Sequence, residues 1–113
     1  MESKNKILPL DDASRQEVRP LDYYMGYFPN AQVLKSIHSY KANLKHTGEI
    51  GMVWADDKSV GDGNQIMRHL IDWREAHDRG DYEEALYHAT AIAWRGDELL
   101  ERYSQKKTPF DND

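Results

Sequence analysis

The sequence predicts an all-α protein, a small bundle of three main helices preceded by an irregular N-terminal arm. Apolar residues recur at helical spacing in three separate stretches, and turn residues lie between these stretches. With 113 residues, 39% of them hydrophobic, the chain is long enough for one domain and too apolar to be disordered. We therefore expect an arm over residues 1–29, a helical domain over 30–105 and a polar tail over 106–113.

The arm contains three prolines and shows no sustained helical period. Its end, residues 21–28, is different, because four of its eight residues are aromatic. This is more apolar surface than a free tail carries, so we expect the segment to dock on the domain or on a second subunit. The four residues are Tyr23, Tyr24, Tyr27 and Phe28.

The first main helix is predicted over residues 31–46. Asn30 can cap its first turn, and Gly48 is a natural stop beyond its last turn. Its predicted apolar positions are Val33, Leu34, Ile37, Tyr40 and Leu44. The glycine-containing stretch 49–63 that follows has no regular period, and we expect a structured loop anchored by Trp54.

The second helix is predicted over residues 62–77, with Asp62 or Asn64 accepting its first amide protons. Its apolar side consists of Ile66, Met67, Leu70, Ile71 and Trp73. Residues 78–80 then turn the chain. Such a short turn makes the second and third helices antiparallel neighbours, which the first helix can close into a three-helix unit.

The third helix follows Asp81, which has Glu84 three residues later at the spacing of a capping box. It is predicted to run for about 22 residues. Its predicted core stripe contains several small residues, which permit close approach of a partner helix. The stripe is Ala85, Ala89, Ile92, Ala93, Gly96, Leu99, Leu100 and Tyr103.

Composition and charge exclude several classes of function. The net charge of −5, without a basic cluster, argues against duplex nucleic acid as a main partner. No apolar run is long enough to span a membrane and no signal-like segment begins the chain, so we expect a cytoplasmic protein. The absence of cysteine leaves His, Asp and Glu as the possible metal ligands.

Tryptophan content and the aromatic end of the arm predict a homo-oligomer. The three tryptophans, Trp54, Trp73 and Trp94, together with residues 21–28, exceed what a minimal three-helix bundle needs to fill its core. A dimer is the commonest closed form, and we expect it here.

One candidate site fragment lies on the second helix. His69 and Asp72 are three residues apart and share a face, with Arg68 beside them. Imidazole and carboxylate suit divalent metals and guanidinium recognises phosphate, so these residues could hold a metal–nucleotide complex. A solvated polar face with one ordinary side-chain pair is the alternative.

A second fragment lies on the third helix, where Glu84 and His88 form a carboxylate–imidazole pair four residues apart. If the helices pack antiparallel, the pair could add metal ligands opposite Asp72. The alternative is a core histidine bonded to a neighbour.

Four short motifs occur in an order that resembles a known family. They are Val53–Ser59 (VWADDKS), Arg68–Asp72 (RHLID), His88 and Ala93–Arg95 (AWR). In this order they resemble small phage-borne proteins of the dATP/dGTP diphosphohydrolase-like family, whose relatives are the all-α MazG-like nucleotide pyrophosphohydrolases. The similarity spans residues 30–103.

The resemblance implies hydrolysis of purine deoxynucleoside triphosphates to monophosphate and pyrophosphate, with Mg²⁺ or Mn²⁺ as cofactor. Carboxylates and imidazoles would hold the metal and orient water, cations would bind phosphate and an aromatic ring would stack on the base. The implied catalytic residues are Asp72, Glu84 and His88, the metal ligands His69, Asp72, Glu84 and His88, and the substrate-binding residues Trp54, Lys58, Arg68 and Arg95. The alternative is a non-catalytic helical protein that binds a nucleotide or a host or phage protein.

Overall fold

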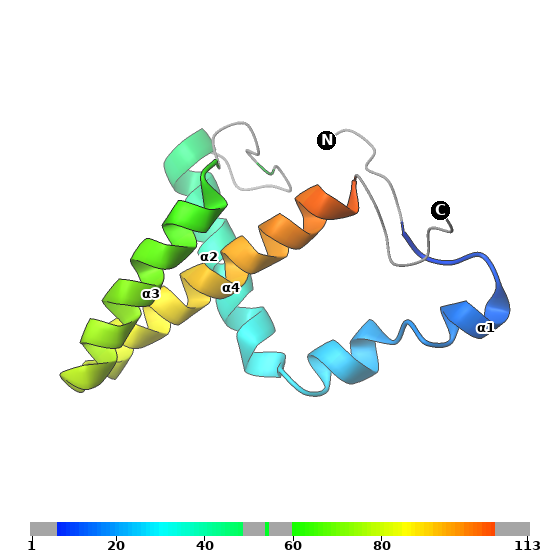
Figure 1. Cartoon of the computed structure of the whole chain (residues 1–113), viewed down its shortest axis with the longest axis horizontal. Helices are drawn as coiled ribbons and strands as arrows, with labels where there is room; N and C mark the ends of the chain where they lie inside the picture. The colour runs from blue at the N-terminus through cyan, green and yellow to red at the C-terminus, as the bar shows by residue number, and fades with distance from the viewer. Residues whose placement is uncertain (1–6, 49–53, 55–59, 106–113) are drawn as a thin grey trace.

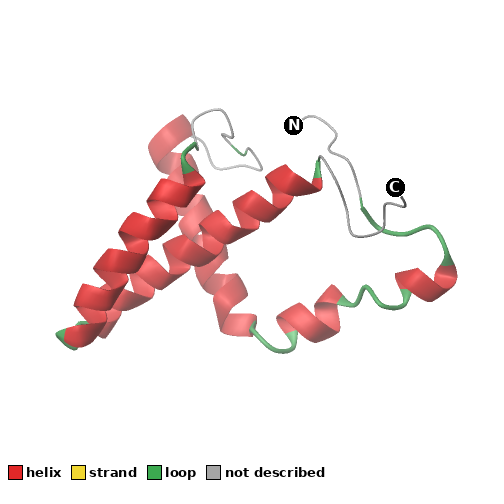
Figure 2. Cartoon of the chain, viewed as in Figure 1, coloured by secondary structure: helices red, strands yellow, loops and turns green. Residues whose placement is uncertain are grey.

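A computed structural model describes residues 7–48, 54 and 60–105 of the chain. Three main helices dominate it, α2 (Pro29–Thr47), α3 (Asp62–Asp78) and α4 (Tyr82–Ser104) (Figure 1). No strand occurs in these described ranges (Figure 2), which confirms the predicted all-α fold. The predicted tail, 106–113, and most of the predicted loop lie outside the described residues.

The arm contains two short helical segments that its proline pattern did not indicate. They are α1 (Asp12–Arg15) and a single π-helical turn, η1 (Leu21–Met25). Asp11 caps α1 by accepting a hydrogen bond from the Ser14 amide. The arm extends away from the crossing point of the three main helices, and a short loop over residues 26–28 joins η1 to α2 (Figure 1).

The helix ends follow the predicted signals in part. Gly48 ends α2 with φ of 72°, and Asp81 caps α4 by accepting the Glu84 amide at 3.2 Å, both as predicted. The predicted caps Asn30, Asp62 and Asn64 are wrong, because all three residues are already helical and the N-cap positions are Phe28 and Gly61. Pro29 is the first residue of α2, a position that suits proline because its missing amide proton has no partner within the helix there, and no side-chain cap precedes it.

Helices α3 and α4 form an antiparallel hairpin, and α2 crosses α4 (Figure 1). The hairpin turn depends on Gly80, whose φ of 77° is a left-handed conformation that other residues adopt only at a cost. The Asp81 amide then bonds to the Ala76 carbonyl at 2.9 Å, closing the end of α3.

The packing faces differ from the predicted ones. Among the described residues, the only buried hydrophobic side chains are three alanines, Ala76, Ala85 and Ala91, while four polar or charged residues are buried, Lys35, Asp62, His88 and Glu98. The apolar faces predicted for the three helices point largely outward. The exposed members of those faces are Val33, Ile37, Tyr40, Leu44, Met67, Leu70, Ile71, Ala89, Ala93, Leu100 and Tyr103.

This difference has a physical cause. Helical period determines which residues share a face, but not which face meets a neighbour within the same chain. The hairpin instead buries a face on which small and polar residues alternate, as the site geometry shows.

Candidate functional site

A line of polar residues runs between α3 and α4. On α4, five polar residues and the buried Ala91 follow one another at steps of four and three, which places them on one face of the helix. On α3, two residues seven apart, Asp62 and His69, meet this face. We call the polar members of this interface the polar seam: Asp62, His69, Glu84, His88, Arg95, Glu98 and Arg102.

A histidine pair occupies the middle of the polar seam. His69 Nδ1 and His88 Nδ1 lie 2.9 Å apart. A hydrogen bond between them requires one ring to donate and the other to accept, so at least one Nδ1 carries no proton. Burial of the His69 ring lowers its pKa, and the nearby His88 lowers it further. Both effects favour the neutral imidazole, which is the form that binds metals.

Glu84 lies on the other side of His88. Its Oε1 is 3.6 Å from His88 Nε2, and its second oxygen pairs with Arg79 in the hairpin turn. The His88 ring is buried, whereas the Glu84 side chain is 44% exposed. Glu84 is therefore placed to orient His88 from the solvent side while its own position is held by Arg79.

The N-terminal end of α3 closes a second cluster. Asp62 and Glu98 are both buried, and Arg95 Nη1 contacts Asp62 Oδ1 at 3.1 Å and Glu98 Oε1 at 3.2 Å. Arg102 contacts the same two carboxylates at 3.4 and 3.6 Å. Trp54 donates from Nε1 to Glu98 Oε2 at 2.7 Å, and the Arg102 guanidinium lies 5.1 Å from the centre of its ring. Two buried carboxylates are thus each shared by two arginines.

The electrostatic state of Asp62 follows from this network. Burial alone would raise the pKa of Asp62, but the hydrogen bond with Glu98 and the charges of Arg95 and Arg102 outweigh it. The net effect is a pKa below the ordinary value of aspartate, so Asp62 stays ionised at neutral pH.

A third imidazole lies near the pair, on α2. The His38 ring centre is 5.7 Å from that of Trp94, and Trp94 Nε1 donates to Ser39 Oγ at 2.7 Å. Burial lowers the pKa of His38, and the charges of His69 and Arg95 lower it further. The polar side of α2 therefore faces α4 close to the polar seam.

The structure brings together some of the predicted site residues and separates others. His69, His88 and Glu84 form one cluster, and Trp54 and Arg95 belong to the other. Asp72 and Arg68 are exposed on α3, and Lys58 lies outside the described residues. Within the described part of the chain, no group of three or more His, Asp or Glu side chains is arranged to hold a metal ion.

Sequence reasoning missed four participants: Asp62 as a buried carboxylate, Arg79, Glu98 and Arg102. The signal for two of them was present on α4, where Glu98 and Arg102 continue the spacing of Glu84, His88 and Arg95. The apolar stripe predicted for that helix lies on a different face.

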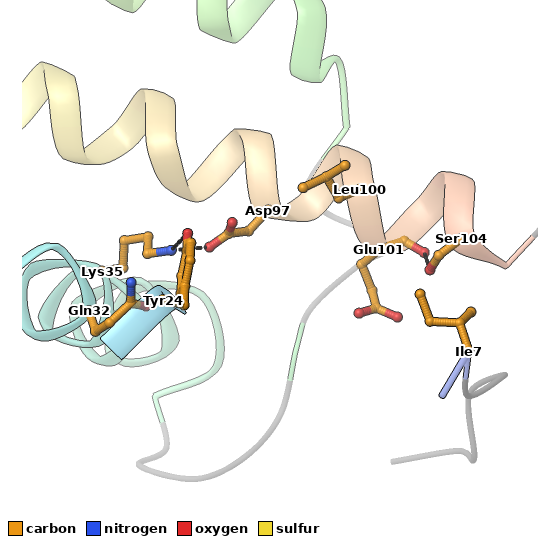
Figure 3. Close-up of a pocket in the computed structure, with 8 residues that line it drawn as sticks. All are labelled: Ile7, Tyr24, Gln32, Lys35, Asp97, Leu100, Glu101 and Ser104. Atoms are coloured by element: carbon orange, nitrogen blue, oxygen red, sulfur yellow. Dashed lines mark hydrogen bonds and ion pairs between the residues drawn. The ribbon is translucent and has the colours of Figure 1, made fainter. Parts of the chain in front are cut away.

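A surface pocket of about 370 Å³ lies between the arm and the C-terminal half of α4 (Figure 3). Lys35 Nζ donates to Tyr24 Oη and to Asp97 Oδ2, both at 2.6 Å, and so connects η1 through α2 to α4. Burial would lower the pKa of Lys35, but the hydrogen bonds to Asp97 and Tyr24 raise it overall. This contact docks one aromatic residue of the arm on the helical domain.

The fold and the polar seam define a small all-α protein whose helical hairpin encloses ionisable side chains. None of its described helices is both long and apolar enough to cross a membrane. Comparison with known proteins finds no matching family, no similar curated protein and no similar solved structure.

Proposed function

We propose that this protein is a metal-dependent nucleotide hydrolase, which converts purine deoxynucleoside triphosphates to monophosphate and pyrophosphate at the polar seam. The observation that carries the proposal is the contact between His69 and His88, with Glu84 behind His88. Two imidazoles from different helices meet there beside a carboxylate, as the motif resemblance implies for a metal site.

No three of the described acidic and histidine side chains are arranged to hold a metal ion, but three features of the histidine pair support a site that substrate oxygens would complete. The 2.9 Å between the two Nδ1 atoms suits adjacent ligands of one ion with metal–nitrogen bonds of about 2.1 Å. A histidine that binds metal through one nitrogen commonly donates from the other to a carboxylate, and Glu84 Oε1 lies 3.6 Å from His88 Nε2, so a small shift of the exposed Glu84 side chain would form that hydrogen bond. Both effects on the His69 pKa favour the neutral ring that binding requires.

The choice of metal follows from the ligand type. Mg²⁺ takes oxygen ligands, whereas imidazole nitrogen suits transition metals, so the pair favours Mn²⁺ over Mg²⁺. Asp72, one turn along α3 from His69, would add an oxygen ligand, and phosphate oxygens would complete the set. When bound, the metal would neutralise phosphate charge and lower the pKa of a water molecule.

The other residues of the proposed site would bind the nucleotide. Arg68 is exposed on α3 directly beside His69, where its guanidinium can bind a phosphate oxygen pair. Arg95 joins the two clusters of the polar seam, since its charge acts on His69 while its side chain pairs with Asp62. Trp54 would stack on the base, and Lys58 would bind phosphate.

Incubation of the purified protein with each of the four deoxynucleoside triphosphates tests this function. We expect the two purine substrates to yield monophosphate and pyrophosphate with Mn²⁺, more slowly with Mg²⁺, and not with excess EDTA. Nucleotide-dependent thermal stabilisation without turnover would contradict hydrolysis and establish a binding protein. If neither turnover nor stabilisation is observed, the polar seam is not a nucleotide site.

Partner binding through the arm is a second candidate function, favoured by a specific observation. Tyr23, Tyr27 and Phe28 remain exposed although Tyr24 docks on Lys35. Tyr27 and Phe28 pack edge-to-face with ring centres 6.0 Å apart. Such a preformed aromatic surface suits a host or phage protein partner, which copurification with wild-type chain but not with a Tyr27→Ser, Phe28→Ser variant would establish.

A further inference from the structure

The pocket between the arm and α4 contains a buried polar atom that no described residue satisfies. Gln32 lines this pocket, and its side-chain amide nitrogen, Nε2, is buried without a hydrogen-bond partner among the described residues. Figure 3 shows this nitrogen pointing toward Lys35 and Tyr24. A buried N–H donor without an acceptor costs free energy, so this position favours a molecule that supplies an oxygen.

Two further donors line the same end of the pocket. Lys35 Nζ has three protons, and its bonds to Tyr24 Oη and Asp97 Oδ2 use two of them. The Tyr24 hydroxyl accepts the bond from Lys35 and retains its own proton to donate. This end of the pocket is therefore rich in donors and suits a hydrogen-bond acceptor.

The charges of the pocket disfavour an anion as that acceptor. The charge of Lys35 is offset by its ion pair with Asp97 at 2.6 Å, and Glu101 adds a second carboxylate one turn further along α4. One cation against two carboxylates leaves an excess of negative charge, which repels a carboxylate or phosphate and attracts a cation. The suitable acceptor is thus a neutral oxygen, such as an amide carbonyl, on a ligand that also has a positive charge.

The other end of the pocket is apolar. Ile7 from the arm and Leu100 from α4 line it, and both side chains are exposed. Figure 3 shows them on the far side of the pocket from Gln32. The volume of about 370 Å³ lies within the range of small-molecule sites, about 300–1,000 Å³. The pocket thus offers hydrogen-bond donors, negative charge and apolar surface to one small ligand.

We propose that this pocket binds a small cationic amide. The amide carbonyl accepts a hydrogen bond from Gln32 Nε2. The ammonium group lies against Asp97 and Glu101, and the apolar substituent contacts Ile7 and Leu100. None of the residues that line the pocket belongs to the polar seam, so this binding does not depend on nucleotide hydrolysis.

Titration with L-leucinamide, followed by nuclear magnetic resonance of the full chain, tests the proposal. This probe combines an amide, an ammonium group and an apolar side chain. We expect saturable shifts of the Gln32 side-chain amide signal and of backbone amides in residues 97–104, with a dissociation constant of about 1 mM. N-acetylleucine, which has a carbonyl but a negative charge, should leave these signals unshifted.

The same chemistry occurs in free amino amides and at the amino terminus of a peptide. Leucyl-glycyl-glycinamide distinguishes these two sources. Tighter binding of this peptide than of L-leucinamide would identify a peptide amino terminus as the ligand. Equal or weaker binding would identify a free small molecule.

Three variants assign the binding to the pocket. Gln32→Leu should weaken L-leucinamide binding by about 3–10-fold through loss of a hydrogen bond, and Glu101→Gln by about 2–5-fold. Gln65→Leu, the same change on α3 outside the pocket, should bind like the wild type. Circular dichroism checks that each variant remains helical.

Three results would overturn the proposal. The first is the absence of saturable shifts in the wild-type chain, which would mean that water alone satisfies Gln32. The second is equal binding of N-acetylleucine and L-leucinamide. The third is unchanged binding by both the Gln32→Leu and the Glu101→Gln variants.

Discussion

His69 and His88, nineteen residues apart in sequence, meet through their Nδ1 atoms at 2.9 Å. The turn at Gly80 folds α4 back along α3, and this brings the two rings to the same level of the hairpin. The contact has consequences for the response of the protein to pH and for the proposed chemistry.

Acid is expected to destabilise the fold in the range in which histidine titrates. The pKa values of His69 and His38 lie below the ordinary value of about 6.5, so the folded chain binds fewer protons than the unfolded chain between the lowered values and about pH 6.5. The free energy of unfolding should therefore decrease as pH falls through this window and change little above about pH 7. Urea unfolding between about pH 5 and 8 measures this without protonating Asp62, whose pKa is lowered.

The His69→Gln variant provides the control for this pH dependence. Glutamine does not titrate, so the decrease in stability toward low pH should become smaller in the variant. A stability profile that is flat in the wild-type chain, or identical in the variant, would contradict the assignment to His69.

Substitutions in and near the histidine cluster should impair the proposed hydrolysis to different degrees. His88→Gln and Asp72→Asn should abolish Mn²⁺-dependent turnover, because each removes a proposed ligand. Glu84→Gln should weaken metal affinity by about 10–100-fold, as expected for a residue that acts through the ligand it orients. The measurement is initial rate against Mn²⁺ concentration for each variant.

His77→Gln is the matched control for that series. His77 is exposed near the end of α3 and stacks on Trp73, with ring centres 5.4 Å apart, away from the polar seam. Turnover by the His77→Gln variant should equal that of the wild-type chain. Equal turnover by Asp72→Asn would remove that residue from the mechanism.

Helix positions were predictable from sequence because local chemistry determines them. Three local features set the helix ends: the Asp81 cap, the left-handed Gly48 and the turn at Gly80. Each depends on residues only a few positions apart, so the residue types alone indicate it. The short turn also fixes the antiparallel hairpin, and with it the meeting of His69 and His88.

Packing faces were not predictable by the same reasoning. Charged residues are usually exposed, yet Lys35, Asp62 and Glu98 are buried because each finds a partner of opposite charge on another element or another turn. Such a pairing depends on tertiary contacts, which no single helical pattern contains.

The buried ion network should contribute more to stability than the exposed pairs do. Asp62→Asn leaves Arg95 and Arg102 without one of their two carboxylates. Removing one member of a buried pair typically costs about 3–5 kcal/mol, and we expect the lower end because both guanidiniums are partly exposed. The free energy of unfolding in urea measures the loss.

Asp78→Asn is the comparison for Asp62. Asp78 pairs with Arg74 at 3.0 Å, but both side chains are more than half exposed. Its loss should cost less than about 1 kcal/mol. Similar losses for the two variants would contradict a special contribution from the buried network.

Two glycines of the hairpin should respond in opposite directions to the same substitution. Gly80 has φ of 77°, so Gly80→Ala forces a side chain into the left-handed region and should lower the free energy of unfolding by about 1–2 kcal/mol. Gly96 lies within α4 in a helical conformation, and an added Cβ would meet no atom within 4 Å. Gly96→Ala should therefore raise the free energy of unfolding by about 0.5–1 kcal/mol, since alanine restricts the unfolded chain and favours the helix.

The two substitutions add the same methyl group, so the sign of the effect isolates backbone conformation from hydrophobic burial. Thermal and urea unfolding of both variants should place the wild-type chain between them. Destabilisation by Gly96→Ala would contradict this expectation and would point to a contact outside the described residues, none of which opposes the methyl group. The oligomeric mass of that variant would then show whether the obstructed contact is with a second copy.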